Sequence, residues 1–248
     1  MELVIFLGAI IIQDRIEECS FVDTNLLLIN DHTSVSGSIV TVSEIHDEVI
    51  ICQGSTTKCE SFDGDVSVAI APTRLEHQHA PMCQYEGQAV VIAGSGTETV
   101  EALQFSGWQL EPSHPLGKLY WTEFEIPANF CGASCTSLDD GIIVAGGYSA
   151  ADGFFKDVYL FREELWKKVG ELNHKYGYAS MINYGTYFLI FGGAYEDLVV
   201  ERINWDGEKI TSTEKINDHE GICHRPIIFQ SDPDTCSTPC PDSFCYQF

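Results

Sequence analysis

Residues 173–205 read NHKYGYASMINYGTYFLIFGGAYEDLVVERINW, and this stretch is the clearest copy of a unit that predicts the architecture of the chain. The pair Tyr184-Gly185 is typical of a tight hairpin turn between two short β-runs. The second run ends on Gly192 and Gly193, and a polar loop then leads to a third run that ends at Trp205. Runs of this length between turns predict a small antiparallel sheet rather than a helix.

The same unit recurs along the chain. Apolar runs that end in glycine occur at 49–54, 90–94, 142–147 and 188–193, and their first glycines are 40, 52 and 46 residues apart. One small sheet cannot bury both of its faces, so we expect successive sheets to pack face to face around an axis. The structural positions expected of this repeat are Gly54, Gly94, Gly146, Gly147, Gly192, Gly193, Trp108, Trp166 and Trp205.

The order of turn, apolar strand, Gly-Gly, loop, strand and tryptophan resembles the kelch repeat, most closely over residues 131–205. Ser55 and Ser95 replace the second glycine in the earlier copies. The resemblance implies an all-β, kelch-type β-propeller of four-stranded blades. The expected number is about five or six blades, and the propeller could be incomplete. A ring could close by pairing the N-terminal strand with the C-terminal one. The family implies a non-enzymatic scaffold that binds a protein through loops at one face or at the mouth of the central channel.

The chain is expected to divide into an apolar run at 1–12, a propeller at 13–230 and a Cys-rich tail at 231–248. The run LVIFLGAIII at 3–12 is long enough for the apolar region of a signal peptide and too short to span a bilayer. It also fits the first strand of the repeat, because Gly8 lies 46 residues before Gly54. Both interpretations are carried forward.

Net charge narrows the class of partner. The chain has 37 acidic against 13 basic residues, and its formal net charge is −24. Nucleic acid and anionic membrane surfaces would be repelled, whereas a basic protein would be attracted. We therefore expect a protein partner of basic character, no nucleic acid and no membrane span, although the same charge also favours solubility.

Ten cysteines indicate an oxidising compartment. Cys236, Cys240 and Cys245 lie in a polar, proline-containing tail, where burial as apolar thiols is not expected. These three are predicted to form disulfides, and Cys131 and Cys135 to pair elsewhere or stay buried. The sequence thus favours a secreted, extracellular protein, with a cytoplasmic scaffold of reduced thiols as the alternative.

Histidines and acidic pairs are the candidates for chemistry. Four histidines could be read as copper ligands of a propeller oxidase, but they occupy similar positions in three repeats, which favours a structural role in turns. A zinc site formed by His77, His79 and Cys83 would lack a second pair of ligands. The histidines are His77, His79, His174 and His224.

Acidic pairs at Asp63 and Asp65, at Asp139 and Asp140, and at Asp232 and Asp234 stand in turn-type sequences. No nucleophile elbow or phosphate-binding loop is present in the sequence. We predict no catalytic residue, no metal and no cofactor.

Two aromatic residues lie outside the register of the repeat. Tyr120 and Trp121 occur in the segment that lengthens one repeat to 52 residues. They are therefore the aromatic residues predicted to be exposed for binding a partner.

Overall fold

The computed structural model describes residues 7–12, 15–20, 38–42, 48–52, 56–62, 67–95, 99–106, 118–128, 130–193, 198–219 and 245–247. This part of the chain consists of β-strands and connections, so the prediction of an all-β fold is confirmed. A search of the same residues finds no helix with the length and hydropathy needed to cross a membrane.

Four antiparallel sheets follow one another along the chain, and within each the strands are paired largely in chain order. The first sheet contains β3 (Ser38–Val42), β4 (Glu48–Cys52), β5 (Cys59–Phe62) and β6 (Ser67–Ile70). The second contains β7 (Met82–Tyr85), β8 (Gln88–Ile92), β9 (Thr99–Ser106) and β10 (Lys118–Glu125).

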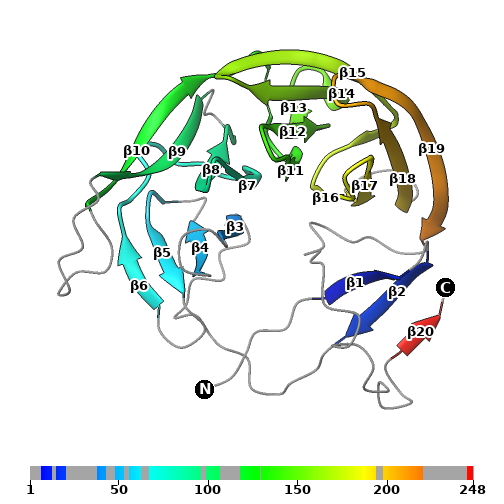
Figure 1. Cartoon of the computed structure of the whole chain (residues 1–248), viewed down its shortest axis with the longest axis horizontal. Coiled ribbons are helices and arrows are strands. Elements are labelled where there is room, and N and C mark those ends of the chain that lie inside the picture. Colours follow the sequence, from blue (N-terminus) through cyan, green and yellow to red (C-terminus); the bar gives the residue numbers. More distant parts are fainter. Residues whose placement is uncertain are drawn as a thin grey trace.

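The third sheet contains β11 (Ser134–Ser137), β12 (Ile142–Ala145), β13 (Tyr148–Ser149), β14 (Gly153–Arg162) and β15 (Leu165–Tyr176). The fourth contains β16 (Ala179–Asn183), β17 (Tyr187–Gly192), β18 (Leu198–Trp205) and β19 (Ile210–His219). These four sheets stand around a common centre, with β3, β7, β11 and β16 innermost, which is a propeller-like arrangement (Figure 1).

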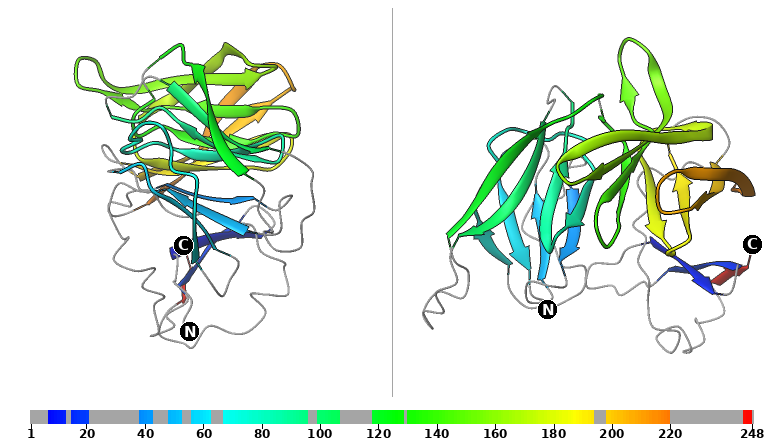
Figure 2. Two further views of the ribbon diagram at one scale, coloured as in Figure 1. Left: turned by 90° about the vertical axis from the view of Figure 1, so that its left-hand side faces the viewer. Right: turned by 45° about the horizontal axis from the view of Figure 1, so that its top comes forward.

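A fifth, three-stranded sheet brings the two ends of the chain together. It contains β1 (Leu7–Ile12), β2 (Arg15–Ser20) and β20 (Cys245–Gln247). β2 pairs antiparallel with both β1 and β20, and the dark blue and red strands lie side by side in Figures 1 and 2. Much of the apolar run at 3–12 is therefore a strand, and Cys19 stands opposite Cys245 in the register.

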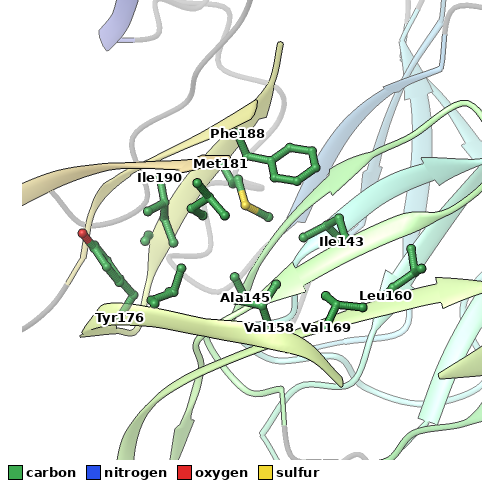
Figure 3. Packing of buried hydrophobic residues seen from close by; sticks show 12 residues of the cluster. Ile143, Ala145, Val158, Leu160, Val169, Tyr176, Met181, Phe188 and Ile190 are labelled. Atoms are coloured by element: carbon green, nitrogen blue, oxygen red, sulfur yellow. The ribbon is translucent and has the colours of Figure 1, made fainter. Parts of the chain in front are cut away.

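Apolar clusters between neighbouring sheets hold the ring together, as expected when each sheet buries both faces. Figure 3 shows one of them, in which Ile143 and Leu160 of the third sheet face Met181 and Phe188 of the fourth. Comparable clusters join the first sheet to the second and the second to the third.

Two of the predicted tryptophans lie at these contacts. Trp166 packs against Phe130 and Phe161, with ring centroids 5.2 and 4.8 Å apart. Trp205 packs against Phe188 at 5.8 Å. Trp108 and Gly54 lie outside the described residues.

The glycines that end the apolar strands are needed for two reasons. Gly146 has φ +70, a left-handed conformation, and a Cβ there would lie 2.5 Å from the carbonyl oxygen of Tyr176. Gly94 has φ +129, and its Cβ would lie 2.9 Å from the carbonyl oxygen of Gln78. Backbone from the loop before the innermost strand therefore occupies the space a side chain would need.

Within the part of the chain that the structure describes, two disulfides are formed, and both lie in the sheets. Cys52–Cys59 crosslinks the adjacent strands β4 and β5, where the two residues stand directly opposite. Cys83–Cys135 joins β7 to β11 and so links the innermost strands of two neighbouring sheets. Cys135 thus pairs elsewhere, as expected, and Cys131 is buried.

Candidate functional site

Three loops lead into the innermost strands, and they share one conformation. We call residues 77–80, 130–133 and 176–179 the entry loops. His79, Gly132 and Tyr178 hold the same place in them, with φ values of 63°, 64° and 60°. Positive φ is uncommon for residues with side chains, so its repetition at one position indicates that the fold imposes it.

Main-chain hydrogen bonds join the entry loops from one sheet to the next. The N–H of Gly132 donates to the carbonyl oxygen of His79 at 2.8 Å, and the N–H of Tyr178 donates to that of Gly132 at 2.6 Å. The third residue of each loop is therefore tied to its neighbour. These contacts fix the backbone at one end of the ring, which we call the mouth.

Aromatic side chains cover this fixed backbone. The Tyr178 ring lies over Gly132, because a Cβ built on that glycine would be 3.0 Å from Cε1 of the tyrosine. His79 meets Tyr178 edge to face, with ring centroids 5.3 Å apart and an interplanar angle of 83°. Both side chains are half-buried.

The β13–β14 hairpin adds a second aromatic pair at the same end. The N–H of Tyr148 donates to the carbonyl oxygen of Cys131 at 2.7 Å, which anchors the hairpin to an entry loop. Tyr148 and Phe154 pack at 5.1 Å, and Phe154 lies on Gly177, whose Cβ would be 2.2 Å from its ring. All four aromatic residues are half-buried, and together they form the mouth cluster: His79, Tyr148, Phe154 and Tyr178.

A buried carboxylate supports the chain segment leading to the entry loop in two of the sheets. Glu101 and Glu201 have no exposed surface. Glu101 accepts the N–H groups of Arg74 and Leu75 at 2.7 and 2.9 Å. Glu201 accepts those of residues 173 and 174 at 3.1 and 2.8 Å. Charge-assisted bonds of this kind are stronger than neutral ones, so these segments are firmly positioned.

His77 completes the first of these supports. Its Nδ1 lies 2.5 Å from the carbonyl oxygen of Ala93 and its Nε2 lies 3.1 Å from Glu101. A carbonyl oxygen only accepts, so Nδ1 is the donor there. His77 and Glu101 therefore form one buried hydrogen-bonded pair.

The equivalent place in the entry loop that leads into the fourth sheet holds Tyr176. Its hydroxyl donates to the carbonyl oxygen of Val199 at 3.0 Å, and burial, with a smaller effect of nearby Glu201, raises the pKa of Tyr176. His174 contacts Glu201 through Nδ1. His77 and His174 thus each contact a buried glutamate that accepts hydrogen bonds from the segment before an entry loop.

The predicted binding residues lie elsewhere. Tyr120 and Trp121 are on β10, opposite Gln104 and Leu103 of β9, at the outer edge of their sheet. The mouth, in contrast, is at the innermost strands. The remaining predicted positions outside the described residues are Asp63, Asp65, His224, Asp232, Asp234, Cys236 and Cys240.

Metal ligands do not gather in the described part of the chain. A search of those residues finds no group of three His, Cys, Asp or Glu side chains that could hold a metal ion. His79 instead contacts Tyr178, and Asp139 and Asp140 stand exposed at the hairpin turn between β11 and β12.

The mouth cluster had a signal in the sequence. Aligning the copies on Ala80, Ala133 and Ala179 places His79 and Tyr178 at one position. The buried carboxylates likewise follow valine in both copies, as Val100-Glu101 and Val200-Glu201. Neither signal stands out when the search is for catalytic motifs.

Comparison with known proteins is informative about the fold alone. No protein-family model matches the chain, and no curated protein matches it. Among solved structures, the propeller-like YjhT superposes with a TM-score of 0.50 at 18% sequence identity, over 64% of this chain and 52% of YjhT. The chain thus spans about half the length of that structure, and the likeness supports a propeller-like arrangement of small β-sheets.

Proposed function

We propose that this protein is a secreted, kelch-type propeller scaffold that binds a protein partner at its mouth and catalyses no reaction. The mouth cluster carries the proposal. Tyrosine and other aromatic residues are enriched at protein interfaces, where they provide a large contact area for little loss of side-chain freedom. Four of them stand half-buried on one end of the ring.

The rigidity of the entry loops supports binding. Loops that are already ordered lose less entropy when a partner docks, so more of the contact energy appears as affinity. Here the inter-sheet bonds of Gly132 and Tyr178 and the contacts of Glu101 and Glu201 hold the backbone before any partner arrives. A surface prepared in this way suits recognition.

Two further observations support the kelch and secretion parts of the proposal. The kelch resemblance implies small sheets of four strands that pack around a common centre, and it also implies glycine at the end of the second strand of each sheet. Small sheets around a common centre are present, and glycine stands at that strand end in the second, third and fourth of them. The disulfides Cys52–Cys59 and Cys83–Cys135 suit an extracellular environment, because cytosolic thiols are kept reduced.

Site-specific photocrosslinking tests the proposal. A photoreactive phenylalanine analogue is introduced at Tyr148 in the mouth and, as a matched control, at Leu165, which is 70% exposed at the opposite end of the ring. The protein is then incubated with extracellular fluid from its native tissue. Crosslinks that form from position 148, disappear on Tyr178→Ala and are absent from position 165 support the proposal. Equal crosslinking from both positions, or none from 148, contradicts it.

A further inference from the structure

The charges of the mouth differ from those of the whole molecule. The chain as a whole has a formal charge of −24. Around the mouth, residues 71–80, 130–133, 146–153 and 173–179 carry two exposed cations and two exposed anions: Arg74, Lys175, Glu76 and Asp152. A ligand therefore approaches through a strongly negative field and meets, on these described segments, balanced charge and aromatic rings.

Aromatic rings favour positive ligands at short range. The faces of tyrosine and phenylalanine rings carry partial negative charge, and they attract the ammonium of Lys or the guanidinium of Arg. Tyr178 rests one face on Gly132 and meets His79 edge to face, so the ring is fixed. Phe154 is held in the same way on Gly177. The orientation of both rings is thus set before binding.

We propose that the mouth receives a basic segment of the partner, with a Lys or Arg side chain placed against the rings of Tyr148, Phe154 and Tyr178. This inference rests on the proposed function. Long-range attraction and short-range ring contact both favour a cation, and the net charge opposes an acidic segment. The two contributions differ in salt dependence, because screening weakens attraction across the solvent and leaves direct contact largely intact.

Selection from a library of short random peptides tests the proposal. The full chain is the bait, and peptides that also bind the Tyr178→Ala variant are removed. Enrichment of peptides that contain Lys or Arg supports the inference. Enrichment of peptides without basic residues contradicts it but leaves binding at the mouth intact. Failure to enrich any peptide that depends on Tyr178 contradicts both the inference and the proposed mouth.

Affinity measurements on a selected peptide make the test quantitative. Replacing its basic residue by norleucine, which keeps the length and removes the charge, is expected to weaken binding about tenfold. Tyr178→Phe keeps the ring and should bind as wild type does, Tyr178→Ala should lose about tenfold, and Leu165→Ala should change nothing. High salt should leave the difference between Tyr178→Phe and Tyr178→Ala in place. A norleucine peptide that binds equally well would overturn the inference.

Discussion

At the scale of single residues, the buried carboxylates are the least expected feature. Glu101 and Glu201 have no exposed surface, yet each sits on a strand where alternation would place a charged residue toward solvent. Their partners are N–H groups 26 to 28 positions earlier in the chain. Sequence patterns within a strand cannot reveal partners so far away. The glycines at the strand ends were predictable because they recur in every copy.

Replacing either buried carboxylate by its amide should destabilise the protein. In Glu101→Gln, the side-chain NH2 group would face the N–H group of Arg74 or Leu75, and the remaining hydrogen bond would no longer be made to a charged oxygen. We therefore expect the free energy of unfolding to fall by about 1–3 kcal/mol. Exposed Glu76→Gln is the control, with a change near zero. Urea denaturation measures both. An unchanged midpoint for Glu101→Gln would show that the carboxylate does not support the loop.

Gly185 and Gly146 have similar φ angles, so replacing each by alanine separates the cost of the left-handed backbone from the cost of a close contact at Cβ. Gly185 has φ +78 and open space around it, so Gly185→Ala should lose only about 1–2 kcal/mol for the left-handed conformation. Gly146→Ala should lose clearly more, because its Cβ would approach the Tyr176 carbonyl oxygen at 2.5 Å. Thermal or urea denaturation compares the two. Equal losses would rule out the close backbone approach.

At the scale of strands and sheets, the hairpin turns were predictable and the disulfides were not. Turns lie where Asp140-Gly141 and Tyr184-Gly185 place them, because such pairs adopt tight turns locally. The bond between Cys83 and Cys135 requires knowing that β7 and β11 are neighbours in space. Cysteine spacing alone does not contain that information. The disulfides expected of the tail stay a prediction, and the described sheets contain Cys52–Cys59 and Cys83–Cys135.

The two disulfides should differ in their effect on stability. A crosslink stabilises more when it closes a longer loop, and the separations are 52 residues for Cys83–Cys135 and 7 for Cys52–Cys59. We expect the double alanine variants to lose about 4 and about 2 kcal/mol respectively. Denaturation without reductant measures each variant. If removing Cys52–Cys59 costs more stability than removing Cys83–Cys135, these bonds do not stabilise the protein mainly by restricting the unfolded chain.

Acid should weaken the β14–β15 pair. Lys156 and Lys168 donate to Glu171 and lower its pKa to about 2. Because the folded state prefers the ionised carboxylate, its contribution is present above pH 4.5 and disappears as the pH falls toward 2. Glu171→Gln should therefore flatten the loss of stability across that window. The effect is expected to be small and to fade in high salt, since the side chain is 44% exposed. The prediction is contradicted if the free energy of unfolding of the wild type and of Glu171→Gln falls equally between pH 4.5 and pH 2.

At the scale of the whole molecule, the period of the repeat predicted small sheets around a centre, and the kelch resemblance implied that the N-terminal and C-terminal strands could pair. The sheet of β1, β2 and β20 depends on a pairing between residues 17–19 and 245–247, which no local pattern encodes. The mouth is likewise a property of the ring. His79 and Tyr178 lie in entry loops that lead into different sheets, their rings meet, and Tyr178 covers Gly132 of a third entry loop. Tyr120 and Trp121 lie on β10, the outer strand of their sheet, and their role in binding stays a prediction.

Thiol labelling checks the redox state of the molecule. In the denatured but unreduced protein, Cys52, Cys59, Cys83 and Cys135 should resist alkylation, and after reduction all four should label. Peptide-resolved mass spectrometry reports each position. Labelling of these four before reduction would favour the cytoplasmic scaffold. Protection of the tail cysteines as well would bear out the prediction made for them.

The bonds between the entry loops use main-chain atoms alone. The bonds from Gly132 N–H to His79 oxygen and from Tyr178 N–H to Gly132 oxygen involve no side-chain atom, so they can persist with any residue that accepts φ near +60° and keeps its N–H. The mouth is therefore a natural framework for laboratory evolution. Positions 148 and 154 can be varied in a display library together with positions 79 and 178, the latter two limited to residues that accept positive φ, much as antibody loops vary on a constant frame. Such a library would turn one ring into a source of new binders.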